Sequence, residues 1–142
     1  MQRDMDDLAF RFFKLFAQYE STMKERGLFQ KDNRGGVYAD WNRFAKEIVG
    51  PNFRDKVGDA ADYILQNPPK KQAVNEDGVI IWKDVPSDDQ SVQALFGHIC
   101  RMRNNLFHGA KFNGTWFDPD RSKLLLEKGL AILEHYRQWL GH

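Results

Sequence analysis

Two arginines, two amides and a histidine lie within eight residues of one another near the end of a segment with helical periodicity: Arg101, Arg103, Asn104, Asn105 and His108. A neutral histidine can take the proton from a ribose 2′-OH, and a protonated histidine can protonate the leaving 5′-oxygen. Arginine offers fork-shaped donors to the charged phosphate of the transition state. These residue types therefore point to RNA cleavage without a metal.

The spacing of the group limits how one helix can use it. Arg103 and His108 are five residues apart, which is roughly 140° around a straight helix, so one helix does not direct both at one atom. They converge if the helix loosens near Gly109, or if two copies face each other across a two-fold axis. Asn104 and His108 share a face. A structural alternative stays open, because cations near a helix C-terminus also interact favourably with the helix dipole.

The string Arg-Asn-Asn-Leu-Phe-His at 103–108 resembles the Arg-polar-x-x-x-His motif of HEPN domains, the higher eukaryotes and prokaryotes nucleotide-binding family. The aromatic-rich segment 12–20, with its embedded glutamate, is similar to the opening helix of many members. The resemblance covers the first helix and the last two. It implies a metal-independent endoribonuclease that acts as a homodimer, with two motifs building one cleft.

By motif position, the resemblance implies that Arg103 stabilises phosphate, that Asn104 supports it and that His108 is the acid or base. Members serve in toxin–antitoxin, phage-defence and CRISPR-associated systems. We therefore expect a toxin or phage-defence effector that cleaves single-stranded RNA, with an antitoxin or regulatory protein as a further partner. One alternative is a non-catalytic module of the same kind that binds RNA, a nucleotide or a protein. Another is an antitoxin or assembly subunit in which the motif is incidental.

Four further residues are candidates for supporting the site or contacting RNA: Arg101, His98, Lys111 and Glu20. The spacing of His98 and Arg101 lets them share a side of the motif helix. Lys111 belongs to a local charge excess of 5 − 2 = +3 over residues 101–123. Glu20 lies in the first helical segment. Structural alternatives stay open, with His98 as a packed helix residue and Glu20 as a solvated charge.

Composition narrows the class of protein further. The chain has 142 residues, 42% of them hydrophobic, which is enough for one domain over 1–142 with its own core. The formal net charge is +1, so any RNA must be held by a local patch and not by bulk charge. The single cysteine, Cys100, excludes an intrachain disulfide and a multi-cysteine zinc site. We expect no metal, no cofactor and no membrane segment, and a cytoplasmic protein.

The elements that must position these residues are mainly helices. Apolar residues recur at spacings of three and four, and predict helices over 4–26, 40–50, 52–66, 87–109 and 118–140. The β-branched and aromatic run 79–82 follows a turn-like segment and predicts a short hairpin within 70–86. Segments 30–36 and 110–118 are interpreted as loops. The prediction is an all-α bundle of about five helices with a small β-hairpin insertion.

Overall fold

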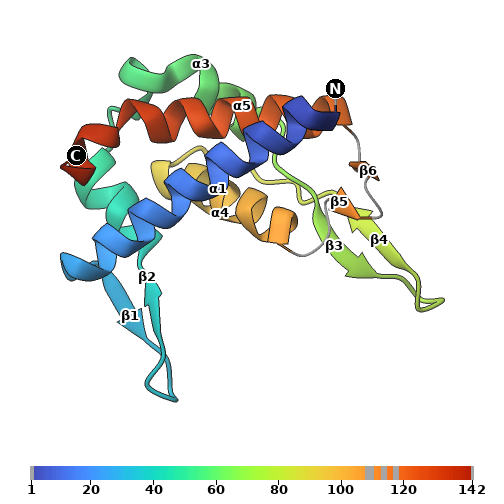
Figure 1. Ribbon diagram of the computed structural model, residues 1–142, viewed down its shortest axis with the longest axis horizontal. Coiled ribbons are helices and arrows are strands. Elements are labelled where there is room, and N and C mark those ends of the chain that lie inside the picture. The colour runs from blue at the N-terminus through green and yellow to red at the C-terminus, as the bar shows by residue number, and fades with distance from the viewer. Residues whose placement is uncertain (1, 108–110, 113–114, 117–118, 142) are drawn as a thin grey trace.

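The computed structural model describes residues 2–107, 111–112, 115–116 and 119–141. Within these ranges the chain forms five α-helices (Figure 1): α1 (Gln2–Glu25), α2 (Trp41–Arg43), α3 (Phe53–Gln66), α4 (Val92–Phe107) and α5 (Pro119–His135). A π-helix, η1 (Phe44–Val49), continues α2, and a 3-10 helix, η2 (Arg137–Leu140), follows α5. The predicted, mostly helical fold is therefore confirmed.

Three antiparallel hairpins lie between the helices in the described ranges: β1 (Phe29–Lys31) with β2 (Val37–Ala39), β3 (Lys71–Val74) with β4 (Ile80–Lys83), and β5 (Lys111–Phe112) with β6 (Thr115–Trp116). The predicted hairpin within 70–86 is confirmed. The interpretation of 110–118 as a loop is wrong, because the segment contains the paired strands β5 and β6. The loop predicted over 30–36 is confirmed for 32–36, whereas Gln30 and Lys31 belong to β1 and pair with β2. Strands of two or three residues carry too little alternation to be seen in a sequence.

Turn chemistry closes the first of these missed hairpins. The Asp32 carboxylate accepts hydrogen bonds from the backbone N–H groups of Arg34 at 2.8 Å and Gly36 at 2.7 Å. Gly35 has a φ of +82°, a conformation that glycine adopts without steric cost. The pairing of β1 with β2 is therefore set by the turn and not by an apolar face.

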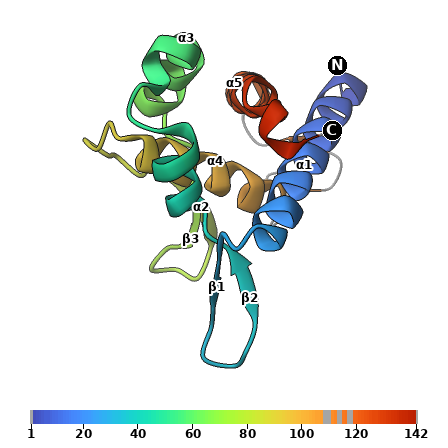
Figure 2. The ribbon, with the colours of Figure 1, turned by 90° about the vertical axis from the view of Figure 1, so that its left-hand side faces the viewer.

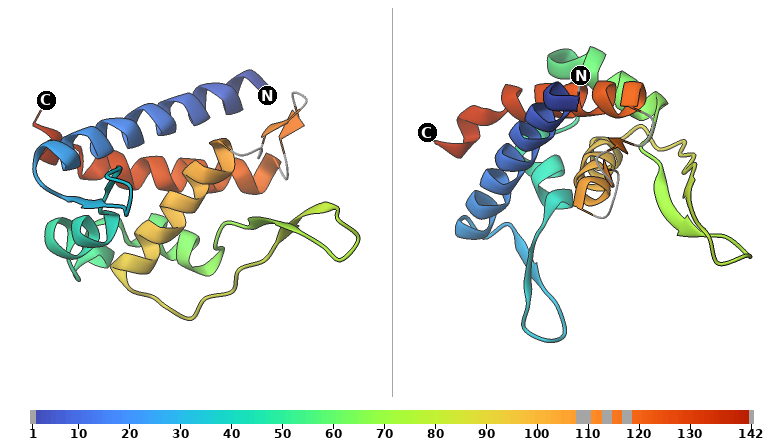
Figure 3. Two further views of the ribbon diagram at one scale, coloured as in Figure 1. Left: turned by 90° about the horizontal axis from the view of Figure 1, so that it is seen from below. Right: turned by 45° about the vertical axis from the view of Figure 1, so that its right-hand side comes forward.

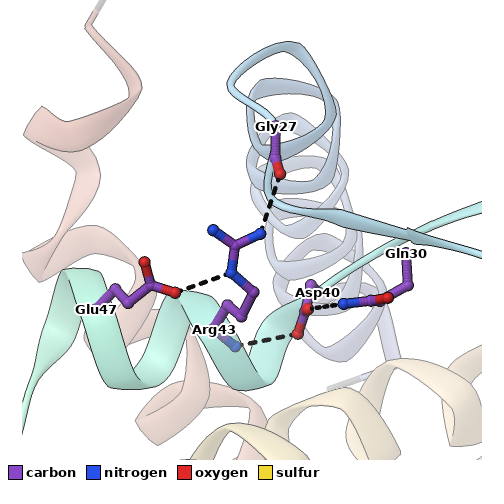
Figure 4. Close-up of polar contacts among 5 residues, drawn as sticks. All are labelled: Gly27, Gln30, Asp40, Arg43 and Glu47. Carbon is purple, nitrogen blue, oxygen red and sulfur yellow. Dashed lines mark hydrogen bonds and ion pairs between the residues drawn. The ribbon is translucent and has the colours of Figure 1, made fainter.

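Side-chain caps fix where the short helices begin. Asp40 precedes α2, as predicted, and accepts from the Arg43 backbone N–H at 3.1 Å and from Gln30 Nε2 at 2.7 Å (Figure 4). The Arg43 side chain donates to Glu47 at 2.9 Å and to the Gly27 carbonyl at 3.2 Å, so the same turn is tied to the end of α1.

The start of α4 differs from the sequence prediction. The helix begins at Val92 and not near residue 87, because the Ser91 hydroxyl accepts from the backbone N–H of Ala94 at 3.1 Å and caps it. The following apolar residues lie in one contiguous core together with those of the other helices.

Helix α5 packs between α1 and α3, and α4 lies against all three (Figure 2). The helices pack tightly at Gly129 of α5, where an added Cβ would lie 3.1 Å from Phe12 Cε1 and 3.3 Å from Met102 Cε. The Tyr19 hydroxyl donates to the Leu133 carbonyl at 2.5 Å, which adds a polar tie between α1 and α5. None of the described helices is long and apolar enough to cross a membrane.

We expect Gly129→Val to lower the free energy of unfolding by about 1–3 kcal/mol, since the new side chain overlaps buried neighbours. Urea denaturation followed by circular dichroism measures the change. Gly97→Val is the matched control, because a Cβ at this helical glycine meets no atom within 4 Å. The control should stay within about 0.5 kcal/mol of wild type. Equal losses in both variants would contradict the close approach at Gly129.

Candidate functional site

The motif residues lie in the last turns of α4, at the end of the helix as predicted. The described part of α4 ends at Phe107, and His108 lies outside the described residues. The backbone of Lys111 belongs to β5, while its side chain also lies outside what the structure describes. The roles predicted for His108 and Lys111 therefore stay predictions.

A groove of ≈ 400 Å³ opens beside this part of α4. Helix α4 contributes Arg101, Asn104 and Asn105, and the start of β3 contributes Lys71. With Gln72, two positive side chains and three amides lie in one concave surface. They suit a phosphate-bearing ligand, since both kinds of group donate hydrogen bonds to phosphate oxygens. The structure thus brings together three of the residues that the sequence singled out as a group.

Backbone carbonyls before β3 explain how two of these residues are held. The carbonyl oxygens of residues 68, 69 and 70 accept from Arg121 at 2.7 Å, Arg101 at 3.3 Å and Asn105 at 2.8 Å. Residues 68 and 69 are prolines, which have no N–H and cannot take part in a regular ladder. Side chains must therefore satisfy these carbonyls. Arg101 and Asn105 are positioning residues that hold the hairpin against α4.

Asn104 lines the groove, and Arg103 reaches it through a contact with Asn104. Arg103 Nη1 donates to Asn104 Oδ1 at 3.2 Å, so the arginine and the amide of the motif are in direct contact. The Arg103 guanidinium also lies 5.9 Å from the ring centroid of Phe13 on α1, within cation–π range. Phe13 is 38% exposed and was missed by the sequence reasoning. Phe13 lies outside the apolar stripe of α1, and this position could have indicated from the sequence that its ring is partly exposed.

Glu20 has a structural partner. Its carboxylate accepts a hydrogen bond from the Trp41 indole Nε1 at 2.9 Å, which ties α1 to α2. The prediction that Glu20 is a site residue is therefore not supported by a contact with the groove. Glu20 is half-buried, and its carboxylate has a structural role beyond that of a solvated charge. A buried indole N–H needs an acceptor, and Glu20 supplies it.

Cys100 lies in the wall of the groove. Burial, with a smaller contribution from the Glu20 charge, raises the pKa of its thiol to about 12. The thiol is therefore protonated at neutral pH and is a poor nucleophile. Cys100 acts as a small apolar wall residue, not as a reactive group.

His98 is in the core and not in the groove. It is 5% exposed, and neither ring nitrogen has a hydrogen-bond partner among the described residues. Of its two predicted roles, that of a packed helix residue is confirmed, because its spacing from Leu95 and Met102 places His98 on the buried stripe of α4. His98 makes no contact with the groove that would support a role with RNA. Burial, and then the charge of Arg101, lower the pKa of the imidazole.

The buried imidazole predicts a pH dependence of stability. The unfolded chain takes up a proton near the ordinary histidine pKa, while folded His98 takes it up only at lower pH. The stabilisation is therefore fully present above about pH 6.5 and is lost as the pH falls toward the folded pKa. Urea denaturation between about pH 7.5 and about pH 5.5 measures this fall.

His98→Leu should flatten that dependence, because the variant has no proton to take up at this position. His135→Leu is the matched control, since His135 is exposed at the end of α5 and its loss should leave the wild-type slope. A His98→Leu slope identical to wild type would mean that another group titrates.

The neighbouring amides Asn105 and Asn104 allow a test of the hairpin attachment. Asn105→Leu should lower the free energy of unfolding by about 1–2 kcal/mol, because the Lys70 carbonyl loses its donor. It should also speed amide hydrogen exchange in β3 and β4. Asn104→Leu changes an exposed neighbour and should leave both measurements close to wild type. Faster amide exchange in β3 and β4 of the Asn104 variant alone would show that Asn104, and not Asn105, attaches the hairpin.

Comparison of the chain with protein-family models, with curated proteins and with solved structures found no match. Among the described residues, no three His, Cys, Asp or Glu side chains are grouped so that they could hold a metal ion. The candidate site is therefore defined by its own geometry: a motif arginine and amide at the end of α4, beside a groove with two further cations.

Proposed function

We propose that the chain is a HEPN-like, metal-independent endoribonuclease acting on single-stranded RNA. The observation that carries the proposal is the contact between Arg103 and Asn104 at the end of α4, beside the groove. In this reaction the ribose 2′-oxygen attacks the adjacent phosphorus and the bond to the 5′-oxygen breaks. The products carry a 2′,3′-cyclic phosphate and a 5′-hydroxyl. His108 would take the 2′-OH proton, and Arg103 would stabilise the charged phosphate.

The surroundings of Arg103 support a single-stranded substrate. Lys71 and the groove amides can bind successive phosphates. The partly exposed ring of Phe13 beside Arg103 offers a face on which an unpaired base can stack. A base in a duplex is already stacked on its neighbours and cannot use such a ring. Single-stranded RNA also rotates freely enough to align the 2′-oxygen with the breaking bond.

The acid–base chemistry favours two copies of the motif. One histidine takes a proton and a second histidine gives one, whereas each chain contributes one histidine to this motif. We therefore propose a homodimer, with a role as a toxin or phage-defence effector and with an antitoxin or regulatory protein as a further partner. This role rests on the resemblance of the motif alone.

The test is cleavage of a mixed pool of single-stranded RNAs in excess EDTA. Wild type should produce 2′,3′-cyclic phosphate ends. His108→Ala should lower the rate by about 100-fold or more, and Arg103→Ala by about 100- to 1,000-fold. His135→Ala and Arg34→Ala are matched controls on exposed residues outside the groove, and each should cleave like wild type.

The groove also supports one alternative, a module that binds RNA without cutting it. Folded wild type that leaves RNA intact, yet binds it in a salt-dependent manner that Arg103→Ala weakens, would replace the ribonuclease with this binding module. If the His108→Ala variant cleaves RNA as fast as wild type, the motif takes no part in the reaction.

A further inference from the structure

Two phenylalanine side chains are exposed on the outer side of α1. Phe10 is 65% exposed and Phe13 38%, whereas the other large apolar side chains of this helix belong to the core or pack against it. Helices α5 and α4 pack against the inner side of α1 (Figure 2). Because the two phenylalanines are three residues apart, their rings are neighbours on the helix surface. Contiguous exposed apolar surface of this kind is typical of a binding site.

The two rings are continuous with the candidate site. The C-terminal end of α4 lies beside the N-terminal half of α1 (Figures 1 and 3), where the Arg103 guanidinium lies 5.9 Å from the ring centroid of Phe13. Phe10 lies about 4.5 Å further along the axis of α1, toward its N-terminus. Going outward from the motif, the surface therefore presents a cation, a first ring and then a second ring.

The charges around the rings favour an anionic ligand. Lys14 is exposed and lies four residues from Phe10, so it is on the same side of the helix. Arg103 lies at the other end of the pair, and the groove beyond it adds two further cations. The acidic residue Asp7 comes one turn before Phe10 and ends this positive surface. Aromatic rings among cations are typical of proteins that bind single-stranded nucleic acid, with bases on the rings and phosphates at the cations.

We propose that Phe10 and Lys14 form a second base-binding position for single-stranded RNA. The base next to the one on Phe13 stacks on the Phe10 ring, and Lys14 binds a phosphate of the same stretch. Because Asp7 repels phosphate, α1 holds two consecutive nucleotides and the strand leaves the protein beyond Phe10. This inference rests on the proposed function in taking RNA as the ligand of the motif.

The test is binding of a fluorescent 2′-O-methyl RNA of about ten nucleotides, measured by fluorescence anisotropy. The probe has no 2′-OH to attack its phosphates, so it reports binding without cleavage. Phe10→Leu keeps an apolar side chain but removes the ring, and should raise the Kd of the probe about fivefold or more. Phe10→Trp restores a ring and should bind at least as tightly as wild type.

Tyr38→Leu is the matched control for loss of an exposed ring. Tyr38 is 54% exposed and belongs to β2, in a different hairpin. The Kd of this variant should stay within about twofold of wild type. Circular dichroism confirms that each variant is folded.

A probe of the same length without bases separates stacking from phosphate binding. With this probe Phe10→Leu should bind like wild type, because no base is left to stack. Lys14→Ala should weaken both probes, and should lower the slope of log Kd against log salt by about 0.7. Lys24→Ala is the matched control, an exposed lysine about 15 Å further along α1, and should keep the wild-type slope.

Three results would each overturn the second base-binding position. One is a Phe10→Leu variant that binds the complete probe like wild type. Another is an equal loss in this variant with and without bases. The third is a wild-type dimer in sedimentation velocity that Phe10→Leu dissociates, since a second copy of the chain would then cover the rings.

The inference and the ribonuclease proposal fail separately. Wild type that cleaves RNA while Phe10→Leu binds the probe equally well keeps the ribonuclease and removes the second base. Wild type that binds the probe through Phe10 but leaves RNA intact keeps the base-binding position and removes the ribonuclease. Wild type that binds no single-stranded RNA overturns both.

Discussion

Trp41 lies between α1 and α4, and its packing sets how these two helices face each other. Its ring stacks on Phe16 at 4.7 Å and on Phe96 at 5.8 Å, while its indole N–H is held by Glu20. Because Trp41 directly follows the Asp40 cap, a local turn positions a ring that touches both long helices. These contacts set the rotation of α4 about its own axis. One side of α4, with His98, is buried, and the other, with Asn104, is open.

The second constraint is the pair of prolines before β3. Because proline cannot donate, this segment joins no ladder of its own, and its carbonyls need donors from the helices. Helix α4 supplies two of them, Arg101 and Asn105. Between them, Asn104 lines the groove and contacts Arg103. Arg101 and Asn105 are four residues apart and so share a face of α4, and this face holds the hairpin.

The β3–β4 hairpin shapes the groove as well as the surface of the molecule. Its base contributes Lys71 to the groove, and the hydrogen bond from Asn105 to the Lys70 carbonyl fastens this base to α4. The position of Lys71 beside the motif therefore depends on the attachment of the hairpin.

Most of the helices could be predicted from the sequence, because caps and apolar spacing act over a few residues: Pro119 begins α5, and the apolar stripe of α1 is buried as expected. The β3–β4 hairpin could also be predicted, because its run of β-branched residues is a local signal in the sequence. Packing between distant segments gives different environments to residues of the same type. Asn104 and Asn105 are identical neighbours, yet one is exposed and the other binds a carbonyl 35 residues away. The short strands around Asp32 and the burial of His98 likewise depend on what packs against them. Local preference selects an element, whereas the partner of each side chain is set by segments distant in the chain.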